Sequence, residues 1–199
     1  MVSKKVIHIA HASHSYFANE GDDLRKIVLN DWYFKTATQI KKYHPEIEVE
    51  CWAPEKDNKE YEEFIENDIK LRLFPVNFSP LYGADFSIQM LIALKKEVEK
   101  SYGKYELIIH LHEFHNLHGL IIADIFRNQK IIVQHHGGSW PMKHLKESRA
   151  KRFFTPLFWL GQLYENRVIK NVRKFYALST EELDYLHKKG CDATFRTMG

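Results

Sequence analysis

Short apolar runs alternate along this chain with longer segments in which apolar residues recur at helical spacing. Short runs of this kind suit the strands of a parallel sheet, because those strands are covered on both faces. Parallel neighbours also need a long crossover between them, usually a helix. The alternation therefore predicts a Rossmann-like, doubly wound α/β fold, with a mainly parallel sheet and helices on both of its faces.

The same pattern predicts where the elements lie. Strands are expected at residues 6–10, 47–53, 69–76, 107–111, 130–134, 175–178 and 193–198, and helices at 24–43, 86–100, 117–126, 146–172 and 180–189. Polar and apolar residues alternate over 47–53, which indicates a strand with one exposed face. The charged segment 54–68 is expected to hold a short helical turn, and Pro156 to kink or restart the helix 146–172.

Length and composition bound the class of protein. The chain has 199 residues without an internal repeat or a Gly/Ser-rich linker, so we expect one domain over residues 1–199. The net charge is only +3, which offers no general electrostatic argument for nucleic acid. Its two cysteines do not make a disulfide framework. No segment reaches the roughly 18–20 apolar residues of a membrane span, and a cytoplasmic location is expected.

Polar residues collect after four of the expected strands, and doubly wound folds bind ligands at the carboxyl ends of their strands. These residues are His11, Ser13 and His14; His112 and Glu113; His135, His136, Gly137 and Gly138; and Ser179 to Glu182. Any one of them is more often a loop or capping residue, and Ser179 with Glu182 suits a helix cap. The convergence of four loops is what indicates a binding site.

The histidines also admit a metal site. The chain has 12 of them, and His110, His112 and His115 have the spacing of one half of a metallo-β-lactamase-type dinuclear site. However, Phe114 stands where that motif carries an acidic ligand, and His110 lies inside an expected strand. We therefore favour a core histidine at position 110 and expect neither a metal nor a cofactor. A metal-dependent hydrolase using His110, His112 and His115 stays open as an alternative.

Residues 149–164 combine basic residues with a dense set of aromatic and aliphatic ones. A helix of this composition can lie on a membrane surface, which would make the protein membrane-peripheral, or it can face a partner domain. Apolar stripes on helices more often belong to the core. We therefore favour a helix that packs on the sheet and exposes its basic side.

Several of these segments together resemble glycosyltransferases of family four. The segment YELIIHLHEFHNLHG resembles the family's strand that ends in His-x-His, and KIIVQHHGG resembles its next strand, which ends in His-Gly. The segment ENRVIKNVRKFYALSTEELDYL resembles the family's stretch that ends in a Ser-Glu helix start, and ATFRTMG lies where the family reads "vipNG". The order and spacing of the four segments match over most of the chain.

This resemblance implies the GT-B architecture, in which two Rossmann-like domains transfer a sugar, with retention of configuration, from a nucleotide-sugar donor to a sugar or lipid-linked acceptor. The chain looks like the N-terminal, acceptor-side domain of such a hexosyltransferase-type enzyme, without the C-terminal donor-binding domain and without turnover of its own. The family's E-x7-E signature belongs to that second domain. The matching pair in this chain, Glu55 and Glu63, lies in the wrong place and is taken as chance.

By the same resemblance, His136 is the catalytic histidine that faces the transferred sugar, with Gly137 and Gly138 beside it. A neutral imidazole there can bind a sugar hydroxyl or handle charge near the leaving phosphate. His135 is the next candidate if the register differs by one residue.

The resemblance further implies that His112 and Glu113 line the acceptor cleft. The family places glycines near the donor pyrophosphate in the loop after the first strand, where this chain has only Gly21. His11 and Ser13 are the residues that can serve there instead. A non-enzymatic sugar- or nucleotide-binding module stays open as a third interpretation.

Overall fold

The computed structural model describes residues 3–10, 12–19, 21–79, 85–114, 117–135 and 155–196. Over this part of the chain, eight strands form one sheet in the order β3-β4-β2-β1-β5-β6-β7-β8, and only the β3–β4 pair is antiparallel. The strands are β1 (Ser3–Ile9), β2 (Glu48–Glu55), β3 (Glu62–Glu66), β4 (Ile69–Pro75), β5 (Tyr105–His112), β6 (Lys130–Gln134), β7 (Lys174–Ala177) and β8 (Ala193–Phe195). The predicted fold class is confirmed.

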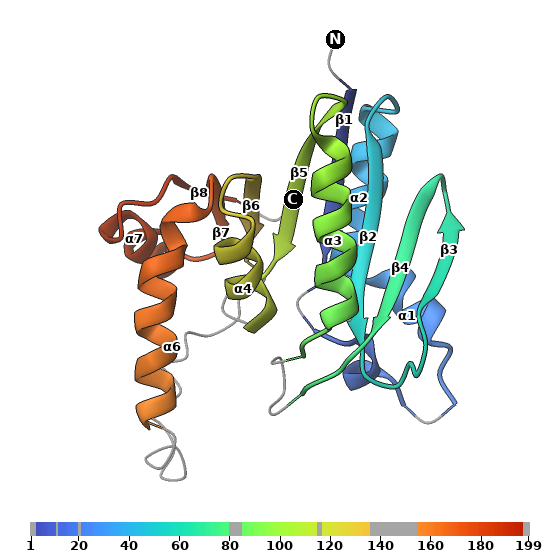
Figure 1. Ribbon diagram of the computed structural model, residues 1–199, viewed down its shortest axis with the longest axis horizontal. Coiled ribbons are helices and arrows are strands. Elements are labelled where there is room, and N and C mark those ends of the chain that lie inside the picture. Colours follow the sequence, from blue (N-terminus) through green and yellow to red (C-terminus); the bar gives the residue numbers. More distant parts are fainter. Residues whose placement is uncertain are drawn as a thin grey trace.

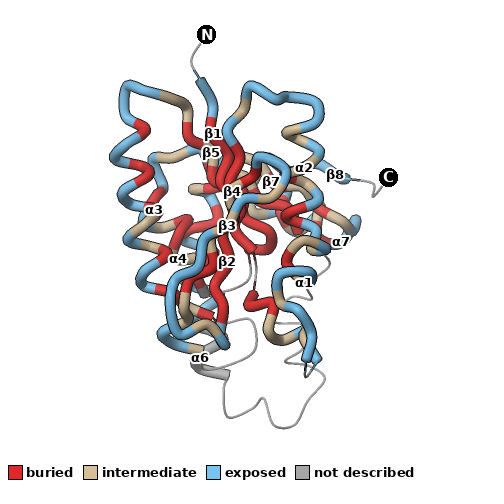
Figure 2. The backbone as a smooth tube through the Cα atoms, turned by 90° about the vertical axis from the view of Figure 1, so that its right-hand side faces the viewer, coloured by how far each residue is buried: buried red, intermediate tan, exposed pale blue. Residues whose placement is uncertain are grey.

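Helices lie on both faces of the sheet (Figures 1 and 2). They are α1 (Leu24–Asn30), α2 (Trp32–Tyr43), α3 (Ile88–Ser101), α4 (Leu117–Ile125), α6 (Thr155–Val168) and α7 (Thr180–Lys188), with short 3₁₀ helices η1 (His14–Phe17) and η3 (Ile169–Asn171). Helices α3, α4 and α6 lie on one side of the sheet in Figure 2, and α1 and α2 on the other. The two sets lie opposite because right-handed crossovers run in one direction from β1 to β2 and in the other from β5 to β8.

Each face of the sheet has its own hydrophobic core. Ile7 and Ile9 of β1 belong to the core beneath α3 and α4. The second core joins α2 to β2 and contains Tyr33, Ala37 and Cys51. Side chains alternate between the faces of a strand, so the residue between Ile7 and Ile9 points toward the α2 side.

The helix expected over residues 24–43 is two helices. The first ends at Asn30, and the Asp31 side chain accepts the backbone N–H of Trp32 at 2.5 Å to cap the second. An aspartate side chain offers the backbone an alternative to the helical bond, which is why it ends one helix and begins another. Trp32, the first residue of the second helix, is 54% exposed.

The charged segment 54–68 holds a strand, so the predicted helical turn there is wrong. β3 pairs antiparallel with β4, and Asn67 and Asp68 connect them with φ angles of 51° and 58°. These positive angles are what a two-residue type I′ hairpin turn requires, and Asn and Asp tolerate them better than most residues. The Asn-Asp pair between two short runs was the signal for this hairpin.

β2 is buried from its second residue to its last, so the predicted exposed face is also wrong. Glu50 is accepted inside because its carboxylate lies 2.6 Å from the Nζ of Lys5 and 3.1 Å from the Nε of Arg72. Lys5 is itself only 2% exposed and lies 2.9 Å from Glu97 of α3. Burial opposes the ammonium charge, but the hydrogen bonds that Lys5 donates to Glu50 and Glu97 hold its pKa above the usual range.

We predict that Lys5→Met lowers the free energy of unfolding by about 3–5 kcal/mol, because it leaves Glu50 and Glu97 without their buried cation. Urea denaturation followed by circular dichroism measures the effect. The matched control is Lys4→Met, since Lys4 is exposed and its replacement is expected to cost within about 0.5 kcal/mol. Equal losses in the two variants would show that the buried network contributes nothing specific.

Candidate functional site

The carboxyl ends of the parallel strands point downward in Figure 1 and carry a group of buried polar side chains. The group includes Ser13, His14, Glu55, Asp85, His112, Glu113, His135 and Glu182. The strand order reverses between β1 and β5, and doubly wound sheets bind ligands at such a switch point. This group of buried polar side chains therefore lies at the edge of the sheet where the sequence predicts a binding site.

One buried histidine ties the β1 end to its neighbours. His14 is 1% exposed, and its ring lies between a Glu55 carboxylate oxygen and Asp31 Oδ2, the latter 2.7 Å from Nε2. Burial by itself disfavours the charged ring, but the carboxylates of Asp31 and Glu55 outweigh it and raise the pKa of His14 to about 9. The ring is therefore an imidazolium at neutral pH and joins η1, β2 and the start of α2.

Ser13 belongs to the same network. Its hydroxyl donates to Glu55 Oε2 at 2.8 Å and accepts the Lys56 backbone N–H at 2.9 Å. Its backbone N–H donates to Asp85 Oδ2 at 2.9 Å. Ser13 is fully buried, so in this structure its polar atoms hold the β1 loop in place.

A second buried histidine ties the ends of β5, β6 and β7 together. His135 Nδ1 lies 2.8 Å from Glu113 Oε1 and 2.6 Å from Glu182 Oε1. Burial acts against the charge, but the two carboxylates outweigh it and raise the pKa of His135 to about 10. Glu182 also accepts the Leu178 backbone N–H at 3.0 Å, while its own N–H donates to the capping hydroxyl of Ser179. We call His135 with Glu113 and Glu182 the strand-end clamp.

The backbone at Glu113 is unusual. Its φ angle is +95°, outside the regions that a residue with a side chain readily adopts. Its N–H donates to the Gln134 carbonyl at 2.9 Å, which continues the β5–β6 pairing by one bond. A strained backbone conformation of this kind persists only where the surrounding contacts hold it in place. Such positions are found more often at ligand sites than elsewhere.

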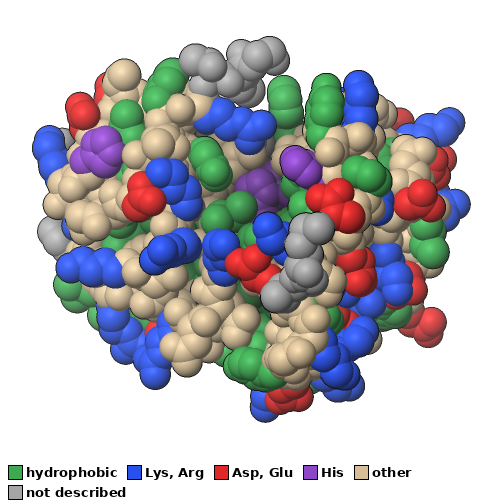
Figure 3. All heavy atoms as spheres, turned by 90° about the horizontal axis from the view of Figure 1, so that it is seen from above, with side chains coloured by type: hydrophobic (Ala, Val, Ile, Leu, Met, Phe, Trp, Pro, Cys, Tyr) green, Lys and Arg blue, Asp and Glu red, His purple; other side chains and the backbone are tan. Residues whose placement is uncertain are grey.

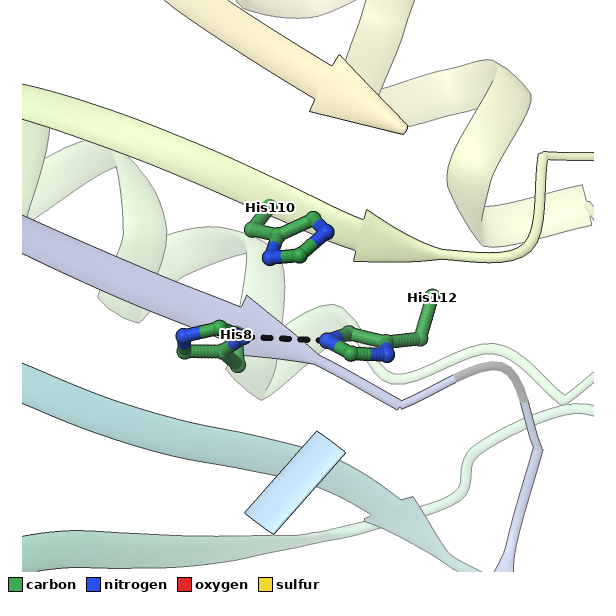
Figure 4. Close-up of side chains that lie close together, drawn as sticks. All are labelled: His8, His110 and His112. Carbon is green, nitrogen blue, oxygen red and sulfur yellow. Dashed lines mark hydrogen bonds between the residues drawn. The ribbon is translucent and has the colours of Figure 1, made fainter. Parts of the chain in front are cut away.

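A third group of histidines lies on the α2 side of β1 and β5 (Figure 4). His8 and His110 are register partners, and His112 follows two residues along β5. His8 Nδ1 and His112 Nε2 are 2.9 Å apart, and all three rings are almost fully buried. Burial lowers the pKa of His8 to about 3, so this ring is neutral.

The remaining predicted site residues are only partly brought together. Gly21 lies in an exposed turn with a φ of +86°, and nothing approaches within 4 Å of the place a Cβ would occupy. His112 and Glu113 are buried against His8 and His135 respectively. His11, His115, His136, Gly137 and Gly138 lie outside the described residues, as do residues 146–154 of the long helix.

The loop after β1 borders a hollow of about 490 Å³ whose lining includes Asp22, Asp23, Asp31 and Lys26. The His14 imidazolium also lines this hollow and pairs with Asp31, so three carboxylates stand against two cations. The remaining negative charge makes a poor environment for a pyrophosphate. The loop after β1 therefore differs from the family's phosphate-binding loop in two ways: it has few glycines, and its surroundings carry negative charge.

Glu55, Asp85 and His8 have no role in the site that the sequence predicts. Glu55 was set aside with Glu63 as a chance pair, although it stands at a strand end and bonds both Ser13 and His14. Its place as the last residue of β2 was the available signal. Nothing in the sequence marked His8, because its partners are more than a hundred positions away.

Comparison with known proteins identifies relatives. The family model described as Glycosyltransferase Family 4 matches residues 41–196. A structure of sucrose-phosphate synthase from Thermosynechococcus elongatus aligns with a TM-score of 0.57 at 13% identity, over 98% of this chain and 48% of that one. A second sucrose-phosphate synthase structure from that organism gives a TM-score of 0.49 at 14% identity, over 98% of this chain and 89% of that one. No curated protein matches the chain.

The two sucrose-phosphate synthase structures share little sequence with this chain. At such low identities the structural likeness concerns the fold alone, which agrees with the mainly parallel sheet described above. The chain spans about half the length of the first sucrose-phosphate synthase structure. Among the described residues, no helix is both long enough and apolar enough to cross a membrane.

We predict that the protein loses stability as the pH rises from about 6.5 to 9, because the pKa of His14 is raised from 6.5 to about 9 in the fold. The stabilisation is fully present below the unfolded pKa and is gone once the folded ring deprotonates. Its size is up to about 3 kcal/mol. Urea denaturation at pH 6, 7, 8 and 9 measures it.

The variant for this test is His14→Gln, which should reduce the dependence and leave the part that His135 contributes, and the control is His44→Gln, which changes an exposed ring. A wild-type stability that does not fall between pH 6.5 and 9, or an unchanged slope in His14→Gln, would contradict the assignment of charge to His14.

Proposed function

The chain belongs to glycosyltransferase family 4, and from this premise we propose that it is the N-terminal, acceptor-side domain of a retaining glycosyltransferase of the GT-B type. Its donor is a nucleotide sugar and its acceptor a sugar or a lipid-linked sugar. The observation that carries the proposal is the family match over residues 41–196, which spans the ends of β2, β5, β6 and β7. The alternative of a hydrolase using His110, His112 and His115 gains no support from these comparisons.

We propose His136 as the residue that meets the transferred sugar, with Gly137 and Gly138 beside it. The alternative residue, His135, is 1% exposed and is held between two carboxylates. A ring held in this way acts as a positioning residue. It ties the chain at the end of β6 to the ends of β5 and β7.

The strand-end clamp also bears on substrate binding. The carboxylates of Glu113 and Glu182 are paired with His135. Their main role in this structure is therefore to hold together the chain segments that follow β5, β6 and β7. His11, Ser13, Gly21, His112 and Glu113 stay proposals as substrate-binding residues. Of these, Ser13 and His112 support the loop and the sheet from inside, and a contact with substrate would come through the backbone they position.

The proposal makes this chain one half of an active site. The first structural relative is about twice as long as the region it shares with this chain. Donor binding would be the task of a C-terminal domain, and the charge around the β1 loop is consistent with a pyrophosphate bound elsewhere. A second domain that binds the donor would hold it in the right orientation next to the acceptor, and this placement is what makes a transfer reaction fast.

Peripheral membrane contact through residues 149–164 also stays a proposal. Within that range, Leu160 and Leu163 of α6 are each 62% exposed, whereas Val168 farther along is buried. Exposed leucines next to basic residues suit an interfacial helix. A cytoplasmic location, on the face of a membrane, would fit a lipid-linked acceptor.

In a protein that carries the donor domain, we predict that His136→Ala lowers kcat/KM for sugar transfer about 10²–10³-fold, the usual cost of removing one group that stabilises developing charge. Transfer from a labelled nucleotide sugar measures it. His44→Ala is the control, since this exposed ring lies at the end of α2. Unchanged transfer in His136→Ala would remove His136 from the site.

We further predict that the 199-residue chain alone gives no sugar transfer above a buffer blank, because half of the site is contributed by another domain. The assay incubates the purified chain with labelled nucleotide sugars and candidate acceptors, and separates products by chromatography. Multiple turnovers by the chain alone would overturn the proposal of a half-site. Tight sugar binding without transfer in the two-domain protein would instead favour a non-enzymatic binding module.

A further inference from the structure

The three histidines of Figure 4 occupy one patch on the α2 side of the two central strands. Parallel pairing of β1 with β5 puts His8 beside His110, and the two-residue period of a strand puts His112 on the same face as His110. The ring centroids are 4.7 Å, 5.2 Å and 4.4 Å apart for the three pairs. Three imidazoles from adjacent strands therefore converge by backbone register, without help from a loop.

Their nitrogen atoms are spaced as metal ligands are. One ring nitrogen from each histidine can be chosen so that all three lie within 4.8 Å of one another, and the closest pair, His8 Nδ1 and His112 Nε2, is 2.9 Å apart. Zn–N bonds of about 2.0–2.1 Å in tetrahedral geometry need nitrogens roughly 3.3 Å apart. Small ring rotations therefore bring the set into a coordination shell.

The cluster is costly as mere packing. His8 is fully buried, its Nε2 has no hydrogen-bond partner among the described residues, and its one polar contact there is the other histidine ring. A buried polar atom left without a partner destabilises a fold, and apolar side chains of similar shape would avoid that cost. The neighbouring core on this face is in fact apolar, with Ala10, Val49 and Ala53 among its members.

The histidine cluster borders a cavity on one side and an aromatic ring on another. His110 lines a cavity of about 510 Å³ whose other lining residues include His44, Ile40 and Ile132. Figure 3 shows histidine and hydrophobic side chains together near the centre of the face seen from above. Of the three histidines, His110 is the one that lines this cavity, so its ring is the one an entering ion would meet first. Tyr33 meets His112 edge-on at 6.0 Å, and its buried hydroxyl has no hydrogen-bond partner in the described part of the chain.

We propose that His8, His110 and His112 bind one divalent late-transition-metal ion, Zn²⁺ first among them, and so cross-link β1 to β5. Imidazole is the ligand type that suits Zn²⁺, Ni²⁺ and Cu²⁺, whereas Mg²⁺ and Ca²⁺ select oxygen ligands. The set differs from the hydrolase spacing of His110, His112 and His115 because its third ligand comes from another strand. Its role is structural, and it stands or falls independently of the proposed glycosyl transfer.

The first experiment uses the whole chain, purified without a histidine tag and stripped with a chelator. Titration with Co²⁺ should give one equivalent per chain with the visible absorption of a four-coordinate site, and Zn²⁺ should displace it. Zn²⁺ should also raise the Tm, because an ion that binds only the folded chain stabilises it by mass action. No binding of either ion at 100 µM would overturn the proposal, and so would six-coordinate Co²⁺ spectra alone.

The second experiment locates the site. His8→Leu and His110→Leu replace buried rings by apolar side chains of similar size, and each should weaken Co²⁺ binding about 100-fold or more while circular dichroism stays unchanged. The control is His44→Leu, which removes a histidine of the same cavity that lies outside the cluster and should leave binding within about twofold. Binding lost in His44→Leu and kept in both cluster variants would place the ion at the surface and overturn the proposal.

If either cluster variant fails to fold, the metal site can still be tested on the wild-type chain by chemical modification of its histidines. Diethyl pyrocarbonate modifies neutral histidine rings, and mass spectrometry of peptides measures which rings react. Bound Zn²⁺ should protect His110, which lines the cavity, and leave His44 and His187 as reactive as before. Equal reactivity of His110 with and without Zn²⁺ would overturn the proposal even without a folded variant.

Discussion

The parallel pairing of β1 with β5 is the constraint on which the rest of this structure depends. β1 lies between β2 and β5. The strands that follow β1 in the chain, β2 to β4, lie on one side of it in the sheet, and β5 to β8 lie on the other side. Right-handed crossovers then place α1 and α2 on one face and α3, α4 and α6 on the other. The same pairing aligns the end of β1 with the end of β5, which creates the edge where the candidate site lies.

Charge is handled differently at the two ends of these central strands. Near the start of β1, Lys5 neutralises the carboxylates of Glu50 and Glu97 inside the fold. At the carboxyl ends, the cations are the imidazolium rings of His14 and His135, each between two carboxylates. Lysine keeps its charge across the physiological range, whereas imidazolium pairs add stability only below their raised pKa values. The site edge is consequently the part of the molecule whose rigidity depends on pH.

The histidine excess of this chain therefore has three separate explanations. His14 and His135 hold strand-end loops through carboxylates. His118 joins the end of β1 to Asp85 through two backbone carbonyls, at 2.9 Å and 3.0 Å. His8, His110 and His112 converge from β1 and β5 with ring nitrogens spaced as metal ligands are, which is why we assign them to a metal ion and not to a loop or a cleft.

The fold class and the places of most strands were determined by the sequence alone, because apolar periodicity and strand length are local properties. β6 lies at the predicted residues 130–134, and β1, β4, β5 and β7 differ from prediction by one to three residues at their ends. The resemblance to glycosyltransferases of family four could also be predicted, since motif order survives in the chain itself; the family match confirms it.

Tertiary structure alone decided which polar residues are buried and with whom. Glu50 looked like the exposed half of an alternating strand, and its burial is stabilised by Lys5 and Arg72 from the two neighbouring strands, together with the indole N–H of Trp52. Apolar periodicity also cannot detect the break between α1 and α2, since a capping aspartate interrupts a helix without changing its apolar spacing. It does not detect the β3–β4 hairpin either. His8 and His112 are 104 positions apart, and Glu55 and His14 are 41 apart. Such pairs exist only because the sheet brings distant strand ends together, which no local pattern encodes.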